Sequence, residues 1–147
     1  MELELTESTL LDVGRETRAV IESLRKIGFH LGIDDFGAGY SSLGYLKNLP
    51  FSSLKIDQSL VHGLENDTND RAIVEAMVAL SHIMGLAVVA EGVETERQRQ
   101  ILLEQGCEFV QGNLLSPPLP AEDFVEWLVD RGGKSGGARP PPGSTRP

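Results

Sequence analysis

The chain has 147 residues, a size that predicts roughly one folded domain with its own core. Its 22 Asp and Glu against 13 Lys and Arg give a net charge of −9, which argues against binding a long nucleic-acid backbone but allows a small anionic ligand where metal ions reverse the local charge. The single cysteine excludes an internal disulfide framework, and no apolar run approaches the roughly 20 residues of a membrane span, so we expect a cytoplasmic protein.

Short apolar segments alternate with amphipathic ones from the N-terminus onward. We expect strands at residues 2–6, 29–34, 53–57, 86–90 and 109–112. A short helical turn is expected at Ser8 or Thr9 and a short helix after Ser41 or Ser42, whereas residues 58–67 are expected to form a loop. Three longer helices are expected to end at Gly28, Gly85 and Gly106.

The helix that ends at Gly106 carries a clear start signal, because Thr95 and Gln98 have the spacing of a capping box. A last helix is expected from Pro120 or Ala121, with Phe124, Trp127 and Leu128 packing it onto the domain. Residues 131–147 are rich in Gly and Pro and have nothing to bury. We therefore expect one domain over residues 1–130, followed by a disordered tail over residues 131–147.

The strand–helix alternation predicts an α/β fold with a parallel sheet. A polar residue recurs in or just after each strand, and the set comprises Glu4, Asp34, Asp35, Lys55, Asp57, Glu91 and Gln111. Five contributing strands favour a barrel, whose C-terminal mouth collects residues from every strand, over an open sheet. Because a complete barrel needs about 250 residues, we expect an incomplete (β/α)8 TIM-like barrel of about five parallel strands, with further strands upstream of Met1.

Asp34 and Asp35 end one of these strands and run into Gly37-Ala38-Gly39. Neighbouring side chains of a strand point to opposite faces, but where the strand breaks into a glycine loop the second acid can return beside the first. Two carboxylates this close repel each other unless a cation lies between them. Judged on this pair alone, the alternative to a metal site is an ordinary solvated turn. Because the whole set of polar residues contains no His or Cys, its oxygen ligands favour Mg²⁺, Mn²⁺ or Ca²⁺ over zinc.

This set of residues can carry out phosphodiester chemistry. Two divalent ions about 3.5–4 Å apart can polarise a phosphoryl oxygen and generate a hydroxide. Lys55 would then stabilise the developing charge, and Glu91 could accept the proton of the water. Lys55 could instead form a Schiff base, as in an aldolase-like barrel, although the neighbouring Asp pair argues for the metal.

Five short motifs occur in a fixed order: Glu4-Leu5-Thr6-Glu7-Ser8, Asp34-Asp35-Phe36-Gly37-Ala38-Gly39-Tyr40-Ser41-Ser42-Leu43, Leu54-Lys55-Ile56-Asp57, Val89-Ala90-Glu91-Gly92-Val93-Glu94 and Gln111-Gly112. On these motifs, the chain from Leu3 to about Leu119 resembles the C-terminal part of the EAL domain, the cyclic di-GMP phosphodiesterase of bacterial signalling. The resemblance implies a modified TIM barrel, a hydrolase that uses magnesium or manganese (Mg²⁺ or Mn²⁺) to open cyclic di-GMP to linear pGpG.

The resemblance also implies roles by position. The residues similar to metal ligands are Glu4, Asp34 and Asp35. Lys55 resembles the residue that stabilises the attacking water, and Glu91 a general base or metal-site acid. Glu7 resembles the anchor of the active-site loop. The residues similar to positions near the substrate or the water are Gln111, Asp57 and Glu94.

Some positions depart from the family pattern. The glutamate of the Glu-Ala-Leu signature and an asparagine ligand are expected before Leu3, so we expect this chain alone to be inactive, and Asn113 and Leu115 stand where the family often has aromatic residues. Two alternatives stay open. The chain could be a non-catalytic module that binds cyclic di-GMP or a partner protein, or a half-barrel that pairs with another chain, including a second copy in a homodimer, to complete its sheet.

Overall fold

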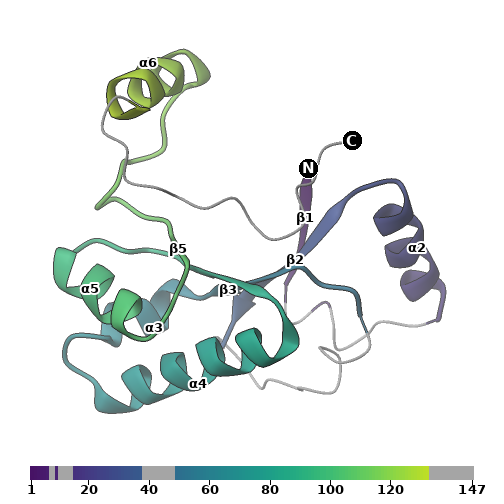
Figure 1. Cartoon of the computed structure of the whole chain (residues 1–147), viewed down its shortest axis with the longest axis horizontal. Coiled ribbons are helices and arrows are strands. Elements are labelled where there is room, and N and C mark those ends of the chain that lie inside the picture. The colour runs from purple at the N-terminus through teal and green to yellow at the C-terminus, as the bar shows by residue number, and fades with distance from the viewer. Residues whose placement is uncertain (7–8, 10–14, 38–48, 133–147) are drawn as a thin grey trace.

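The computed structural model describes residues 1–6, 9, 15–37 and 49–132. Its five strands are β1 (Glu2–Thr6), β2 (His30–Phe36), β3 (Ser53–Ile56), β4 (Ala87–Ala90) and β5 (Phe109–Val110). They form one parallel sheet in the order β1-β2-β3-β4-β5 (Figure 1). This sequential order is that of a barrel wall, so the fold is a partial TIM-like barrel, as the sequence predicts.

In the part of the chain that the structure describes, five helices connect or follow the strands. They are α2 (Arg15–Lys26), α3 (Gln58–Gly63), α4 (Thr68–Met84), α5 (Glu96–Glu104) and α6 (Ala121–Gly132). The capping box at Thr95 and Gln98 is present, and α4 ends at Gly85 in the left-handed conformation, with a φ of +72°. Within the described residues, no helix is long and apolar enough to cross a membrane.

The two faces of the sheet differ in chemistry because side chains alternate along each strand. On one face apolar side chains pack against the helices, and the fully buried ones include Ile33, Leu54, Ile56, Val74, Val78, Val88 and Leu102. On the other face β1, β2 and β3 present Glu4, Asp34 and Lys55, whose charged groups meet. This alternation places the charged residues on the face that lines the interior of a barrel.

The expected limits of four elements are wrong. Residues 58–63, expected in a loop, form α3, because the Asp57 side chain caps the helix by accepting a hydrogen bond from the Ser59 backbone N–H at 2.8 Å. The β2 strand continues to Phe36, and its register against β3 shifts between Ile33 and Phe36. β3 ends at Ile56 and β5 at Val110, before the residues expected to close those strands.

The packing expected for the last helix is also wrong. α6 begins at Ala121, as predicted, but it lies apart from the sheet and the other helices (Figure 1). Phe124 and Leu128 are each 47% exposed, whereas Trp127, the third residue expected to pack, is half-buried.

The expected tail over residues 131–147 starts two residues too early, because α6 continues to Gly132, and its remainder lies outside the described residues. Also outside them lie the expected turn near Ser8, the expected helix after Ser41, and Glu7.

Candidate active site

Lys55 lies at the centre of a charged cluster at the C-terminal ends of the strands. Its Nζ is 2.6 Å from Glu91 Oε1, 3.0 Å from Glu4 Oε1 and 3.4 Å from Asp34 Oδ1. The Lys55 side chain is 13% exposed. Burial by itself would lower the pKa of Lys55, but hydrogen bonds to Glu91 and Glu4 outweigh burial and raise it, so the ammonium stays charged.

Sequence and backbone geometry explain how four elements converge on this lysine. Glu4 is in β1, Asp34 in β2 and Lys55 in β3, on the same face of neighbouring strands. Glu91 directly follows β4, and its backbone N–H donates to Ile56 O at 3.1 Å, which continues the pairing of β3 with β4 by one residue. The parallel arrangement therefore brings the ends of all four strands to one edge.

Asp35 returns beside Asp34, as the sequence analysis expects, although both residues are still inside β2. The φ of Asp35 is +55°, a left-handed conformation that Asp tolerates better than most residues, and it coincides with the register shift of β2. Carboxylate oxygens of Asp34, Asp35 and Glu91 all lie within 4.8 Å of one another. The charge of Asp34, with burial and the charge of Asp57 adding to it, raises the pKa of Asp35, while Lys55 opposes the shift.

This three-carboxylate group fits a divalent cation. Asp34 Oδ1 is buried and has no hydrogen-bond partner among the described residues, although Lys55 Nζ lies 3.4 Å away. A hard cation would satisfy that oxygen and relieve the repulsion between Asp34 and Asp35. Glu4, the third predicted ligand, contacts Lys55 and is not a member of the group.

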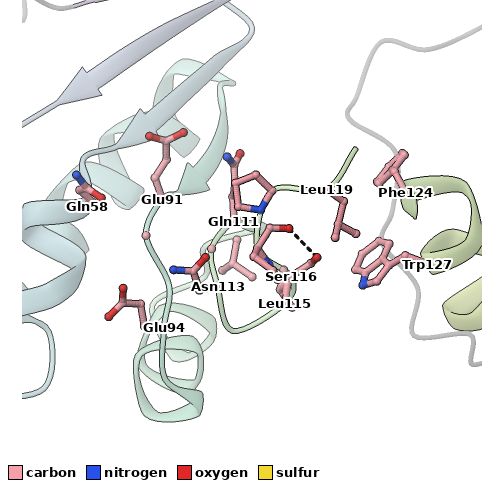
Figure 2. A pocket seen from close by; sticks show the side chains of 15 residues that line it. Gln58, Glu91, Glu94, Gln111, Asn113, Leu115, Ser116, Leu119, Phe124 and Trp127 are labelled. Atoms are coloured by element: carbon pink, nitrogen blue, oxygen red, sulfur yellow. Dashed lines mark hydrogen bonds between the residues drawn. The ribbon is translucent and has the colours of Figure 1, made fainter. Parts of the chain in front are cut away.

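A cleft of about 660 Å³ opens beside Glu91 (Figure 2). One side carries Gln58, Glu91 and Glu94, and the opposite side carries Leu119, Phe124 and Trp127. Leu119 precedes α6, and the rings of Phe124 and Trp127 in α6 are stacked with centroids 5.9 Å apart. Gln111 and Asn113 lie between the two sides, so the cleft combines polar groups near the carboxylates with an apolar wall.

The chain passes very close to itself below this cleft. A Cβ on Gly112 would clash with the backbone of Val93, whose N–H donates to Gln111 O at 3.0 Å. A Cβ on Gly92 would lie 2.6 Å from Gln58 Cβ. Glycine at both positions therefore lets the segments after β4 and β5 and the start of α3 meet at one site.

The structure brings together most of the predicted site residues. Glu4, Asp34, Asp35, Lys55 and Glu91 form the charged cluster; Asp57 interacts with Asp35; and Glu94 and Gln111 line the cleft. Glu7 lies outside the described residues. Gln58 also lines the cleft, although it is not among the predicted site residues. The signal in the sequence is Asp57, a helix-cap residue type directly after a strand, which puts Gln58 at the start of a helix beside the strand ends.

A parallel β/α wall with carboxylates and one lysine at its C-terminal strand ends defines a barrel-type protein with a candidate metal site. The chain belongs to the EAL domain family, whose model matches residues 1–118.

Named relatives agree with this family. The chain is 49% identical over 123 residues to the bifunctional diguanylate cyclase/cyclic di-GMP phosphodiesterase MucR of Pseudomonas aeruginosa, a match that covers 84% of this chain and 18% of MucR. A solved complex of the PaMucR phosphodiesterase with c-di-GMP is 49% identical, with a TM-score of 0.79, and the match covers 84% of this chain and 50% of that one.

A manganese and cyclic di-GMP complex of Klebsiella pneumoniae BlrP1 is 38% identical, with a TM-score of 0.75, and here the match covers 80% of this chain and 30% of BlrP1. The chain thus spans half or less of the length of these relatives.

Proposed function

We propose that this chain carries a phosphodiesterase site that hydrolyses cyclic di-GMP to linear pGpG with the help of divalent cations. The observation that carries the proposal is the placement of Lys55 and the group Asp34, Asp35 and Glu91 at the strand ends, beside a cleft. The c-di-GMP complex of PaMucR and the manganese complex of BlrP1 support the choice of ligand and of cation.

Asp34, Asp35 and Glu91 would hold the cation, which we propose to be Mg²⁺ or Mn²⁺, and Glu4 would join them if it released Lys55. When bound, the cation would polarise a phosphoryl oxygen and activate water, as in two-metal hydrolysis. In this structure Glu4, Asp34 and Glu91 surround Lys55 with negative charge. A bound cation would neutralise part of the same negative charge.

The protein's own groups have separate tasks in this proposal. Lys55 keeps a positive charge next to the reacting phosphate and stabilises the negative charge that develops there. Glu91 forms an ion pair with Lys55 and also lies at the edge of the cleft, where it can accept the proton of the attacking water. Gln58, Glu94 and Gln111 offer hydrogen-bonding groups that orient the substrate in the cleft.

We infer that turnover by this chain alone is slow. Three clustered carboxylates, completed by water, can hold one divalent cation, whereas the two-metal reaction requires two. A single cation would still bind the substrate phosphate, but it would stabilise the attacking and leaving oxygens of the reaction much less than two cations would.

The test is chromatographic detection of pGpG after the purified chain is incubated with cyclic di-GMP and MnCl₂ or MgCl₂. We expect slow formation of pGpG that falls by about a hundredfold in Asp34→Asn, because a cation ligand is lost. Glu75→Gln, at an exposed position on α4, is the matched control and should leave the rate unchanged.

Calorimetry with cyclic di-GMP separates the remaining outcomes. Binding without pGpG would favour the alternative that the chain is a non-catalytic cyclic di-GMP module. A folded chain that neither binds cyclic di-GMP nor forms pGpG would contradict the proposal.

A further inference from the structure

Two aromatic rings form part of the cleft wall opposite Glu91. Phe124 and Trp127 lie one turn apart on α6, and their rings are stacked with centroids 5.9 Å apart and an angle of 18° between their planes. Among the described residues that line the cleft, they are the only aromatic ones. Figure 2 shows both rings on the far side of the cleft from Gln58, Glu91 and Glu94. The wall therefore offers flat apolar rings across the cleft from polar and acidic groups.

Hydrogen bonds fix the path of the chain from the carboxylates to this wall. The Leu114 N–H donates to Val93 O at 3.0 Å. Residues 117–120 then include three prolines, which restrict the backbone. The Phe124 N–H donates to the carbonyl of the last of these prolines at 2.9 Å, in the first turn of α6. Because Val93 is two residues after Glu91, the aromatic wall is held at a defined place relative to the carboxylates.

The two sides of the cleft suit different parts of one ligand. The group Asp34, Asp35 and Glu91 is suited to a divalent cation, which in turn binds a phosphate. Every nucleotide base has a flat π face that can stack on aromatic side chains. An apolar peptide segment would cover the rings but leave the polar groups of Gln58 and Glu94 without partners. A nucleotide fits both sides, because it joins a phosphate to an aromatic base.

We propose that the stacked rings of Phe124 and Trp127 bind one guanine base of cyclic di-GMP while a phosphate of the same ligand is held at the cation group. This inference rests on the proposed function and adds to it the residues that hold a base. The family match covers residues 1–118 and so assigns no role to either ring. The cleft volume of about 660 Å³ lies within the range of about 300–1,000 Å³ that small-molecule sites span.

Fluorescence of the full chain tests the contact without any substitution, because Trp127 is its only tryptophan. We expect titration with cyclic di-GMP in MgCl₂ to quench the emission of Trp127, since a base stacked on the indole changes its surroundings. The quenching should follow the same saturation curve that calorimetry gives for binding. Unchanged emission at saturation would overturn the inference but leave the proposed function intact.

Substitutions of Trp127 separate stacking from apolar contact. Trp127→Leu keeps an apolar side chain but has no π face, so we expect it to raise the dissociation constant for cyclic di-GMP about tenfold. Trp127→Phe should raise the dissociation constant much less, because it keeps an aromatic ring. Val129→Ala is the matched control: Val129 is 72% exposed on the same helix and does not line the cleft, so this variant should bind like the wild type.

The outcomes distinguish this inference from the proposed function. Equal affinities of the wild type and Trp127→Leu would show that the rings do not hold the base, although cyclic di-GMP still binds. Equal losses of affinity in Trp127→Leu and Trp127→Phe would contradict stacking. If Trp127→Leu fails to fold by circular dichroism, the emission of the wild type still decides. A folded wild type that does not bind cyclic di-GMP would contradict the proposed function and this inference with it.

Discussion

Lys55 joins carboxylates from three strands or strand ends, since Glu4, Asp34 and Glu91 all lie within 3.4 Å of its Nζ. Replacing it by methionine keeps an unbranched side chain of similar size but leaves the three acids without their common cation. We expect Lys55→Met to lower the free energy of unfolding by about 2–4 kcal/mol in urea denaturation, because a largely buried ion-pair network loses its central member. Lys26→Met, at an exposed lysine, is the control, and equal stability of both variants would contradict this account.

Cys107 is buried, and burial raises the pKa of its thiol to about 11, from an ordinary value of 9.0. A thiol whose pKa is higher in the folded state stabilises the fold below its unfolded pKa, and that contribution is lost as pH rises from about 9 through 11. At pH 8 the folded chain should react with iodoacetamide about a hundredfold more slowly than the chain in guanidinium, because the thiolate is the reactive form. Equal rates in the two states would show that Cys107 is accessible.

At the residue scale, the conformation of Asp35 could be predicted from the sequence, whereas the ion-pair partner of Glu4 could not. Two adjacent acids before a glycine loop indicated that the second returns beside the first, and the φ of +55° confirms this local geometry. The partner of Glu4 could not be read in the same way, because its contact with Lys55 crosses three strands and depends on the sheet register. The chemical roles of all these residues stay predictions.

At the scale of elements, Asp57 acts on both Ser59 and Asp35, and substitutions can separate the two effects. It caps α3 through the Ser59 N–H, and its charge helps raise the pKa of Asp35. Asp57→Ala should cost about 1 kcal/mol of stability through loss of the cap, whereas Asp57→Asn should retain the cap because Asn is an equally good cap residue. Urea denaturation of both variants measures the difference, and an equal loss in both would assign the effect to charge instead.

The elements that the sequence predicted best are those with many consistent signals. Helices α4 and α5 have periodic apolar positions and recognisable ends, at Gly85 and at the Thr95–Gln98 box. Helix α3 was missed because its six residues are too few to show a helical period. The packing expected of α6 was wrong because periodicity identifies an apolar face, not what covers it.

At the scale of the whole molecule, the parallel wall could be predicted because each strand is followed by an amphipathic segment and ends in a polar residue. The number and order of strands follow from that alternation, and the structure confirms them. The expectation that further strands upstream of Met1 pair with one edge stays a prediction, since backbone pairing at an edge leaves no pattern in the sequence of the edge strand itself.

Because the whole molecule has a net charge of −9, we expect cations to stabilise its fold in two ways that can be measured separately. Any salt should stabilise the fold modestly by screening repulsion among the acids. A divalent cation that binds the group Asp34, Asp35 and Glu91 should add to this effect, by about 2.7 kcal/mol at a hundred times its dissociation constant. We therefore expect MnCl₂ to raise the melting temperature several degrees above NaCl of equal ionic strength.

The double variant Asp34→Asn/Asp35→Asn separates site binding from screening. Removing the two acids relieves the repulsion that raises the pKa of Asp35 but also removes the Asp34–Lys55 ion pair, so the response of each protein is measured against its own melting temperature without divalent cations. The response of the variant to MnCl₂ and to matched NaCl should be the same, because only screening remains. Differential scanning calorimetry measures all four conditions, and an equal excess of MnCl₂ over NaCl in both proteins would place the cation elsewhere on the acidic surface.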